Sequence, residues 1–240
     1  MYENQKIAVV IPAAGSGSRM GTKEVKTFLK LKGRDLIEWT LAPFLESGWI
    51  DQIIIVGRKQ EEERFESLLA QIRSQGIERG ATYPQMKFIP GGPNRLVSVY
   101  NGLGQLNEDI AYVMIHDGAR PLVSIEVIER SLQDTLKHNA SVICVPVKDT
   151  IKVANDEQFV DYTPDRSRLF LIQTPQSFER NLLLRAYEQA MLEGLTATDD
   201  SALVEAFGHP VKLTLGSYNN FKVTTPEDLL LAERLLEDLI

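Results

Sequence analysis

Short apolar runs alternate with segments of helical periodicity over the first 145 residues of this 240-residue chain. The apolar runs, rich in β-branched residues, are residues 7–11, 52–56, 86–89, 111–115 and 141–145. Because polar residues do not alternate within them, we expect strands that are covered on both faces. The segments with apolar residues at helical spacing are 36–47, 61–75, 96–106 and 125–139. Strand then helix, repeated, predicts an α/β fold on a single doubly wound, mostly parallel sheet of the Rossmann-like kind.

The alternation stops after Val145. Residues 146–165, "PVKDTIKVANDEQFVDYTPD", contain two short strand-like pieces around a polar turn. This segment is too long for an ordinary loop and too small for a domain. We therefore predict one domain over residues 1–240, in which 146–165 is an inserted β-hairpin arm that protrudes and forms a partner surface. Helical periodicity returns at 180–194 and 229–240.

Composition limits the partners of the chain. Its formal net charge is −7, whereas nucleic acids and anionic membranes attract dense clusters of Lys and Arg, so neither is expected as a partner. No apolar stretch approaches the roughly 20 residues that cross a bilayer, and the N-terminus lacks the layout of a signal peptide. We expect a cytoplasmic protein. The single cysteine, Cys144, lies in an apolar run and is interpreted as a buried strand residue.

The loop after the first strand, "AAGSGSRMG", is typical of phosphate binding. Gly15 and Gly17 would let backbone N–H groups approach a phosphate. A dinucleotide fingerprint needs a third glycine where Met20 stands, and the Walker A spacing is also absent. Arg19 and Lys26 follow the glycines, and two cations suit the spread charge of a triphosphate. The glycines alone fit a plain strand-to-helix turn equally well.

Two further loops follow predicted strands at the same edge of the sheet, where ligands of doubly wound folds lie. In "IHDGARP", Asp117 is a hard oxygen ligand of the type that Mg²⁺ takes, and Gly118 permits close approach of a sugar. Arg120 can form a forked contact with a phosphate, although a charge pair in a tight turn would also explain these residues. In "GGPNRLVS", Arg95 and Ser98 could contact a base or cap the next helix.

Eight motifs spread from about Ala8 to Leu236 together resemble one enzyme family. They are "PAAGSGSRM", "VKTFLKL", "GGPNRLVSV", "IHDGARP", "PVKDTIK", "DRSRLFLIQTPQ", "TDDSALVE" and "NNFKVTTPEDL". The chain is similar to the 2-C-methyl-D-erythritol 4-phosphate cytidylyltransferases of the non-mevalonate isoprenoid pathway. The resemblance implies conversion of CTP and methylerythritol phosphate into CDP-methylerythritol and pyrophosphate with Mg²⁺.

The resemblance also implies a role for individual residues of this chain. Arg19 and Lys26 would hold the triphosphate, and Lys222 would face the α-phosphate. Asp117 would hold the metal and substrate. The residues implied to contact the methylerythritol phosphate are Arg120, Thr150 and, from the neighbouring subunit of a homodimer clasped by the arm, Arg166. The residues implied to form the cytosine and ribose pocket are Ala13, Ala14, Gly92, Arg95 and Ser98.

The chemistry of this reaction explains the residue types. The nucleophile is a phosphate monoester whose second pKa is about 6, so it is mostly dianionic at neutral pH and needs no general base. Positioning and charge stabilisation by cations and a metal ion then supply most of the catalysis. Two alternatives stay open: a cytidylyltransferase for another polyol phosphate, such as ribitol 5-phosphate, and a non-catalytic nucleotide-binding or interaction protein.

Overall fold

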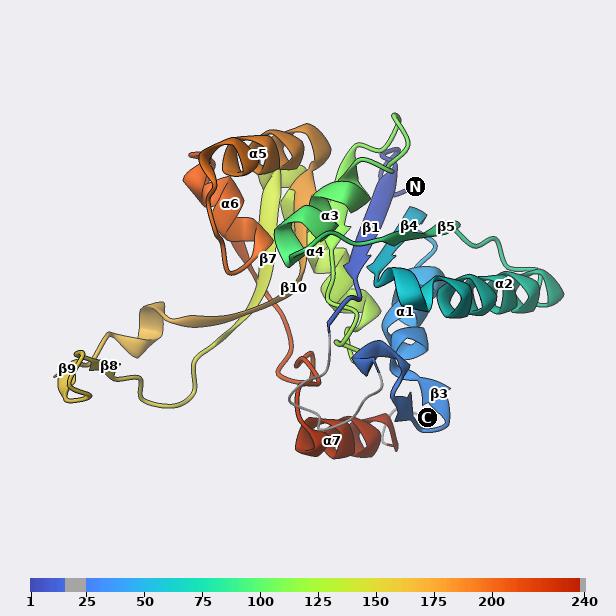
Figure 1. Cartoon of the computed structure of the whole chain (residues 1–240). Coiled ribbons are helices and arrows are strands. Elements are labelled where there is room, and N and C mark those ends of the chain that lie inside the picture. The colour runs from blue at the N-terminus through green and yellow to red at the C-terminus, as the bar shows by residue number, and fades with distance from the viewer. Residues whose placement is uncertain (16–24, 238–240) are drawn as a thin grey trace.

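A seven-stranded sheet forms the centre of the computed structural model, which describes residues 1–15 and 25–237 (Figure 1). In spatial order its strands are β11 (Lys212–Leu215), β7 (Ala140–Pro146), β10 (Phe170–Glu179), β6 (Tyr112–Ile115), β1 (Ile7–Pro12), β4 (Ile50–Gly57) and β5 (Gln85–Pro90). Neighbouring strands run parallel, except that β10 is antiparallel to both β6 and β7. The predicted α/β fold with one mostly parallel sheet is confirmed.

Helices cover both faces of this sheet, as the uninterrupted apolar strands predict. One face carries α1 (Leu36–Glu46), α2 (Glu62–Glu78) and α4 (Ile125–His138); the other carries α3 (Arg95–Leu103), α5 (Arg180–Glu193) and α6 (Asp200–Ala206). Side chains of β1 alternate between the two cores. Ile7, Val9 and Ile11 belong to the first core, and Ala8 and Val10 to the second. All five are fully buried, so β1 is the centre of the hydrophobic core.

The C-terminal helix α7 (Pro226–Glu237) lies beyond the carboxyl end of the sheet (Figure 1). Its Leu236 joins a third apolar cluster that includes Leu36 and Val223. The Val223 N–H also donates to the Ala119 carbonyl at 2.8 Å. The segment before α7 is therefore fastened to the loop after β6, which places Lys222 beside that loop.

Several element boundaries differ from the sequence predictions. β10 and β11 were not predicted, because "FLIQTPQSFE" contains Pro175 and polar residues that argue against a central strand. The proline is tolerated because the pairing of β10 with β7 is irregular between Ile172 and Gln176. The helix predicted at 229–240 begins earlier, at Pro226, and is described to Glu237. Proline suits this first helical position because its missing N–H has no intrahelical partner there.

The predicted arm is a β-hairpin that projects from the body of the molecule (Figure 1). Its strands are β8 (Val153–Ala154) and β9 (Val160–Tyr162), which pair antiparallel. The Asn155 side chain accepts N–H groups of Glu157 and Phe159 and so holds the turn. Phe159 is 67% exposed, and its apolar neighbours in the arm are exposed as well. Elsewhere, no helix within the described ranges combines the length and apolar character that crossing a bilayer requires.

Candidate active site

The three loops predicted to hold a ligand meet around a cavity of about 440 Å³. It lies beyond the carboxyl ends of β1, β5 and β6, where doubly wound sheets bind ligands. Of the candidate site residues, those that line it are Ala13, Ala14, Gly15, Lys26, Gly92, Arg95, Ser98, Asp117, Gly118 and Lys222. Gly17 and Arg19 lie outside the described residues. Segments that are far apart in the sequence thus form one site.

A second cavity of about 350 Å³ adjoins the first. The two share Arg95, Asp117 and Lys222, and the second is also lined by Arg120, Ile172, Gln173, Thr174, Gln176, Thr198 and Asp199. The predicted Thr150 and Arg166 line neither cavity of their own chain. Both are exposed in or beside the arm, where Arg166 donates to the Lys148 carbonyl at 2.6 Å.

Asp117 is the acidic residue among the three that the two cavities share. Lys222 Nζ lies 3.0 Å from its Oδ2 and Arg120 Nε 3.4 Å from the same oxygen. Burial alone would raise the pKa of this carboxyl, but Lys222, Arg120 and Arg95 outweigh burial and lower the pKa to about 2. Asp117 is therefore ionised at neutral pH. Arg120 is itself fixed by the Asn220 carbonyl, to which it donates at 2.8 Å.

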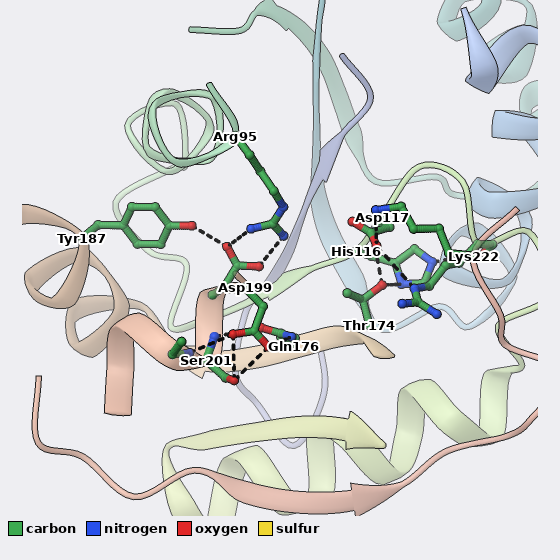
Figure 2. A network of polar contacts seen from close by, with 12 residues as sticks. Arg95, His116, Asp117, Thr174, Gln176, Tyr187, Asp199, Ser201 and Lys222 are labelled. Carbon is green, nitrogen blue, oxygen red and sulfur yellow. Dashed lines mark hydrogen bonds and ion pairs between the residues drawn. The ribbon is translucent and has the colours of Figure 1, made fainter. Parts of the chain in front are cut away.

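His116 is a structural neighbour of Asp117. It is fully buried, and its pKa is lowered to about 4 because burial disfavours the charged ring more than Asp117 favours it. Its Nε2 lies 3.3 Å from the Arg120 carbonyl, which can only accept, so Nε2 carries the proton. Nδ1 then accepts from Thr174 Oγ1 at 3.1 Å, and Thr174 accepts the Asp117 N–H at 3.0 Å (Figure 2). Neutral His116 thus supports the Asp117 loop.

The loop between β5 and α3 is held in shape by Ser98. Its Oγ accepts the Gly92 N–H at 3.0 Å and donates to the Asn94 carbonyl at 2.7 Å. Gly92 is required because a Cβ there would collide with the Val97 side chain. The capping role that the sequence left open for Arg95 and Ser98 belongs to Asn94, whose side chain accepts the Val97 N–H at 2.9 Å.

Arg58 and Thr27 are among the residues of the first cavity that were not predicted from the sequence. Arg58 follows β4, and its Nε donates to the Ala14 carbonyl at 3.1 Å, which fixes the first loop. Thr27 lines the same cavity, and its buried Oγ1 has no hydrogen-bond partner among residues 1–15 and 25–237. The position of Arg58 at a strand end was a usable signal; nothing in the sequence marks Thr27 beyond its place next to Lys26.

A second polar network lies on the other side of Arg95, where Asp200 accepts hydrogen bonds from its guanidinium at 2.8 and 2.6 Å. Figure 2 shows Arg95 and Tyr187 pointing toward one another from different helices. The neighbouring Asp199 accepts from Gln176 Nε2 at 2.9 Å and caps α6. Both aspartates belong to the motif "TDDSALVE", and the contact of Asp200 with Arg95 was not predicted from the sequence.

The residues present fit a divalent cation that is held jointly with phosphates. Within residues 1–15 and 25–237, no group of at least three His, Cys, Asp or Glu side chains could hold a metal alone. Mg²⁺ in nucleotide enzymes is commonly bound by one or two carboxylates together with substrate phosphates. Asp117 supplies one ionised carboxylate at the junction, and its ion pairs with Lys222 and Arg120 both use Oδ2. Its donor chemistry therefore suits a shared site.

Comparisons with known proteins agree with this arrangement. The family model described as "IspD: 2-C-methyl-D-erythritol 4-phosphate cytidylyltransferase" matches residues 7–238. The enzyme of that name from Desulforamulus reducens is 44% identical over 232 residues, 96% of either chain. The one from Alkaliphilus oremlandii is 41% identical over 237 residues, covering 99% of this chain and 98% of its own.

Solved structures give the same result. The 4-diphosphocytidyl-2C-methyl-D-erythritol synthase of Anaerococcus prevotii superposes with a TM-score of 0.84 and 32% identity, covering 97% of this chain and 99% of its own. The 2-C-methyl-D-erythritol 4-phosphate cytidylyltransferase of Thermus thermophilus reaches 0.76 with 33% identity, over 97% and 100% of the respective chains. The similarity thus extends over the sheet, the helices and the loops of the two cavities.

Proposed function

Because the chain belongs to the 2-C-methyl-D-erythritol 4-phosphate cytidylyltransferase family, we propose that its two joined cavities bind the two substrates of that reaction side by side. The enzyme transfers the cytidylyl group of CTP to methylerythritol phosphate and releases pyrophosphate. Enzymes of this family are nucleotidyltransferases that generally use a divalent metal ion. Membership of the family supports this reaction. The role of each individual residue is our proposal.

CTP occupies the first cavity. The backbone of Ala13 and Ala14 faces the base, together with the loop that Gly92 and Ser98 shape. The glycines of the first loop, Gly118 and the cations Arg19 and Lys26 hold the ribose and triphosphate. Lys26 lies in the cavity wall with an exposed fraction of only 8%. Its charge therefore acts where little water screens it.

Methylerythritol phosphate occupies the second cavity. Arg120 lies there with its guanidinium fixed by the Asn220 carbonyl, which presents a pre-oriented donor to a phosphate. Lys222 lines both cavities and therefore faces the point where the phosphate meets the α-phosphorus.

The step itself is an in-line displacement. A phosphate oxygen of the polyol substrate forms a bond to the α-phosphorus of CTP while the bond to the bridging oxygen of pyrophosphate breaks. The attacking phosphate is already mostly dianionic, so no proton need be removed. His116 cannot serve as a base at the reacting atoms because it is fully buried and engaged by Thr174 and Arg120. Catalysis consists of alignment and of positive charge on the reacting and departing phosphates.

Mg²⁺ is the metal we assign to this site, with Asp117 as its protein ligand beside the nucleotide phosphates. When bound, the ion neutralises phosphate charge and orients the triphosphate. Asp117 also keeps Lys222 and Arg120 directed at the junction, through the ion pairs at 3.0 and 3.4 Å.

The active assembly in this proposal is a homodimer. The arm projects from its own body and exposes apolar side chains, among them Phe159 and Tyr162. Thr150 and Arg166 line neither cavity of their own chain, which supports their action on the second cavity of a partner chain. On this basis residues 146–165 are a dimerisation arm on the nucleotidyltransferase domain. A cytoplasmic location remains a prediction.

The observation that carries the proposal is the meeting of the two cavities at Asp117 and Lys222. The experiment is pyrophosphate release with each of the four nucleoside triphosphates crossed with methylerythritol, ribitol and sugar phosphates. We expect release with CTP and methylerythritol phosphate. Activity with ribitol 5-phosphate alone would establish the rival polyol substrate, and no release with any pair would establish a non-catalytic protein.

A further inference from the structure

Arg95 stands at a position that helix stability does not explain. It is the first residue of α3, and the first turn of this helix contains no acidic residue. A cation is unfavourable there because the N-terminus of a helix carries partial positive charge. Yet the Arg95 side chain lines both cavities, together with Asp117 and Lys222. A cation in this place requires an anion that compensates it.

Asp200 is that anion. Its two carboxylate oxygens accept from the two terminal nitrogens of Arg95 at 2.8 and 2.6 Å. Two parallel hydrogen bonds of this kind fix the plane of a guanidinium as well as its position. Asp200 is fully buried, whereas the side chain of Arg95 is 36% exposed. The carboxylate therefore lies behind the guanidinium, which separates it from the cavities.

Tyr187 holds Asp200 from a third helix. Its hydroxyl donates to Asp200 Oδ1, and its ring lies fully buried in the core between α3 and α5. Burial and the charge of Asp200 raise the pKa of Tyr187 well above its usual value, so the hydroxyl stays protonated and remains a donor. Tyr187, Asp200 and Arg95 thus form a chain of contacts that runs from the core to the junction of the cavities.

We propose that Asp200 and Tyr187 are positioning residues, which fix the Arg95 guanidinium where the two cavities meet so that it donates hydrogen bonds to phosphate oxygens of the bound nucleotide. Each terminal nitrogen of a guanidinium has a second N–H besides the one that a bidentate carboxylate accepts. Because the Arg95–Asp200 pair is neutral overall, it contributes direction rather than net charge. Charge neutralisation is left to Lys26 and Lys222.

This inference rests on the proposed function for the identity of the nucleotide, and direct binding separates the two. CTP affinity is measured by titration calorimetry without the second substrate, and turnover is measured separately. We expect Arg95→Gln and Asp200→Asn each to weaken CTP binding by about tenfold or more, and Tyr187→Phe by about three- to tenfold, the loss of one hydrogen bond.

The decisive comparison is the double variant Arg95→Gln/Asp200→Asn. If Asp200 acts through Arg95, this variant binds CTP no more weakly than Arg95→Gln alone, whereas independent effects would add. A merely structural role would lower the melting temperature without this non-additivity. If Asp200→Asn does not fold, the pair Tyr187→Phe and Arg95→Gln/Tyr187→Phe gives the same comparison.

Tyr100→Phe is the matched control. The Tyr100 ring is stacked on Tyr187 with centroids 6.3 Å apart, but its hydroxyl is not part of the contacts with Asp200. This variant should bind CTP like the wild type. Unchanged CTP binding in Arg95→Gln, or additive losses in the double variant, would overturn the inference. Wild-type protein that binds CTP normally but releases no pyrophosphate with methylerythritol phosphate would instead overturn the proposed function.

Discussion

Lys222 Nζ lies 3.0 Å from Asp117 Oδ2, in the wall that the two cavities share. In the sequence the two residues are separated by the arm and by three strands of the sheet, β7, β10 and β11. They meet because Val223 binds the Ala119 carbonyl and because α7 closes the end of the sheet. This contact fixes a cation at the place where, in the proposed reaction, the two phosphates approach each other.

Removal of this cation should abolish most of the turnover. We expect Lys222→Ala, and likewise Lys26→Ala, to lower kcat by at least about a hundredfold, the scale of losing one charged group that stabilises the transition state. The measurement is steady-state pyrophosphate release at saturating substrates. Lys87→Ala, which removes an exposed lysine bonded to Gln105, is the control and should retain full activity. Near-normal kcat in both cavity variants would contradict the assigned roles.

Removal of the charge of Asp117 should change the metal requirement. We expect Asp117→Asn to raise the Mg²⁺ concentration for half-maximal activity by at least about tenfold. Loss of a residue that only supports a metal ligand typically weakens metal binding by about 10- to 100-fold, and loss of a ligand should weaken it at least as much. Asp109→Asn is the control, since Asp109 is an exposed partner of Lys6 far from the cavities. A lower kcat with an unchanged Mg²⁺ dependence would mean that Asp117 acts only on Lys222 and Arg120.

Sharing of the site between subunits can be tested by mixing two impaired proteins at a Mg²⁺ concentration too low for the Asp117→Asn variant to be active. Asp117→Asn damages the cavity of a chain, and Arg166→Ala damages the arm that would reach its partner. In a mixed dimer, one site carries both changes and the other neither, so random exchange should restore about a quarter of wild-type activity. Activity is assayed after co-refolding or prolonged mixing at equal concentrations.

The same arrangement predicts how the chains associate. Replacement of residues 151–163 by a short linker should give a monomer by sedimentation velocity. As a control for the mixing experiment, combining two batches of the Asp117→Asn protein should restore no activity. If the Asp117→Asn and Arg166→Ala mixture stays inactive although the chains exchange, Arg166 serves its own subunit; if the shortened protein stays dimeric, the arm is not the main contact.

The stability of the fold should fall between pH 6.5 and 4 because of His116. The folded-state pKa of about 4 lies below 6.5, the usual value of a histidine side chain. Between these values the unfolded chain binds a proton that the folded chain excludes, so stability is present above pH 6.5 and is lost as the pH falls. Each pKa unit corresponds to about 1.4 kcal/mol, so the loss reaches about 3 kcal/mol at pH 4. Urea unfolding at several pH values measures it.

Two variants isolate this effect. His116→Gln should be less stable than wild type at pH 7 and should show a flatter dependence on pH between 6.5 and 4. His138→Gln, at the exposed end of α4, should keep the wild-type dependence. An unchanged slope in His116→Gln would show that the buried ring is not the group responsible.

The sequence predicted five of the seven strands of the sheet, those that follow simple rules. β1, β4, β5, β6 and β7 are continuous apolar runs, and their burial on both faces leaves the pattern clear. β10 is hidden because Pro175 interrupts it and because Gln173, Thr174 and Gln176 face polar partners of the site. A strand that serves a binding site carries fewer apolar residues, so periodicity alone does not reveal it.

The sequence predicted those parts of the site that lie at the carboxyl ends of strands. Asp117 and Arg95 follow or begin elements at the ligand edge, so topology brings them together. Lys222 was indistinguishable from a surface lysine by composition, because its position depends on how α7 closes the end of the sheet. Asp200 and Tyr187 were missed for the same reason: the contacts of Asp200 with Arg95 and with Tyr187 arise between helices, and no local spacing encodes them.

The course of β10 gives the arm a mechanical link to the chemistry. The strand begins at Phe170, which pairs with Pro146 at the root of the arm, and four positions later carries Thr174, which holds the Asp117 loop. A displacement at the root of the arm therefore reaches the Asp117 loop along one strand. In the proposed homodimer, contact between subunits and alignment of the reactants depend on that same strand, so a change in one is transmitted to the other.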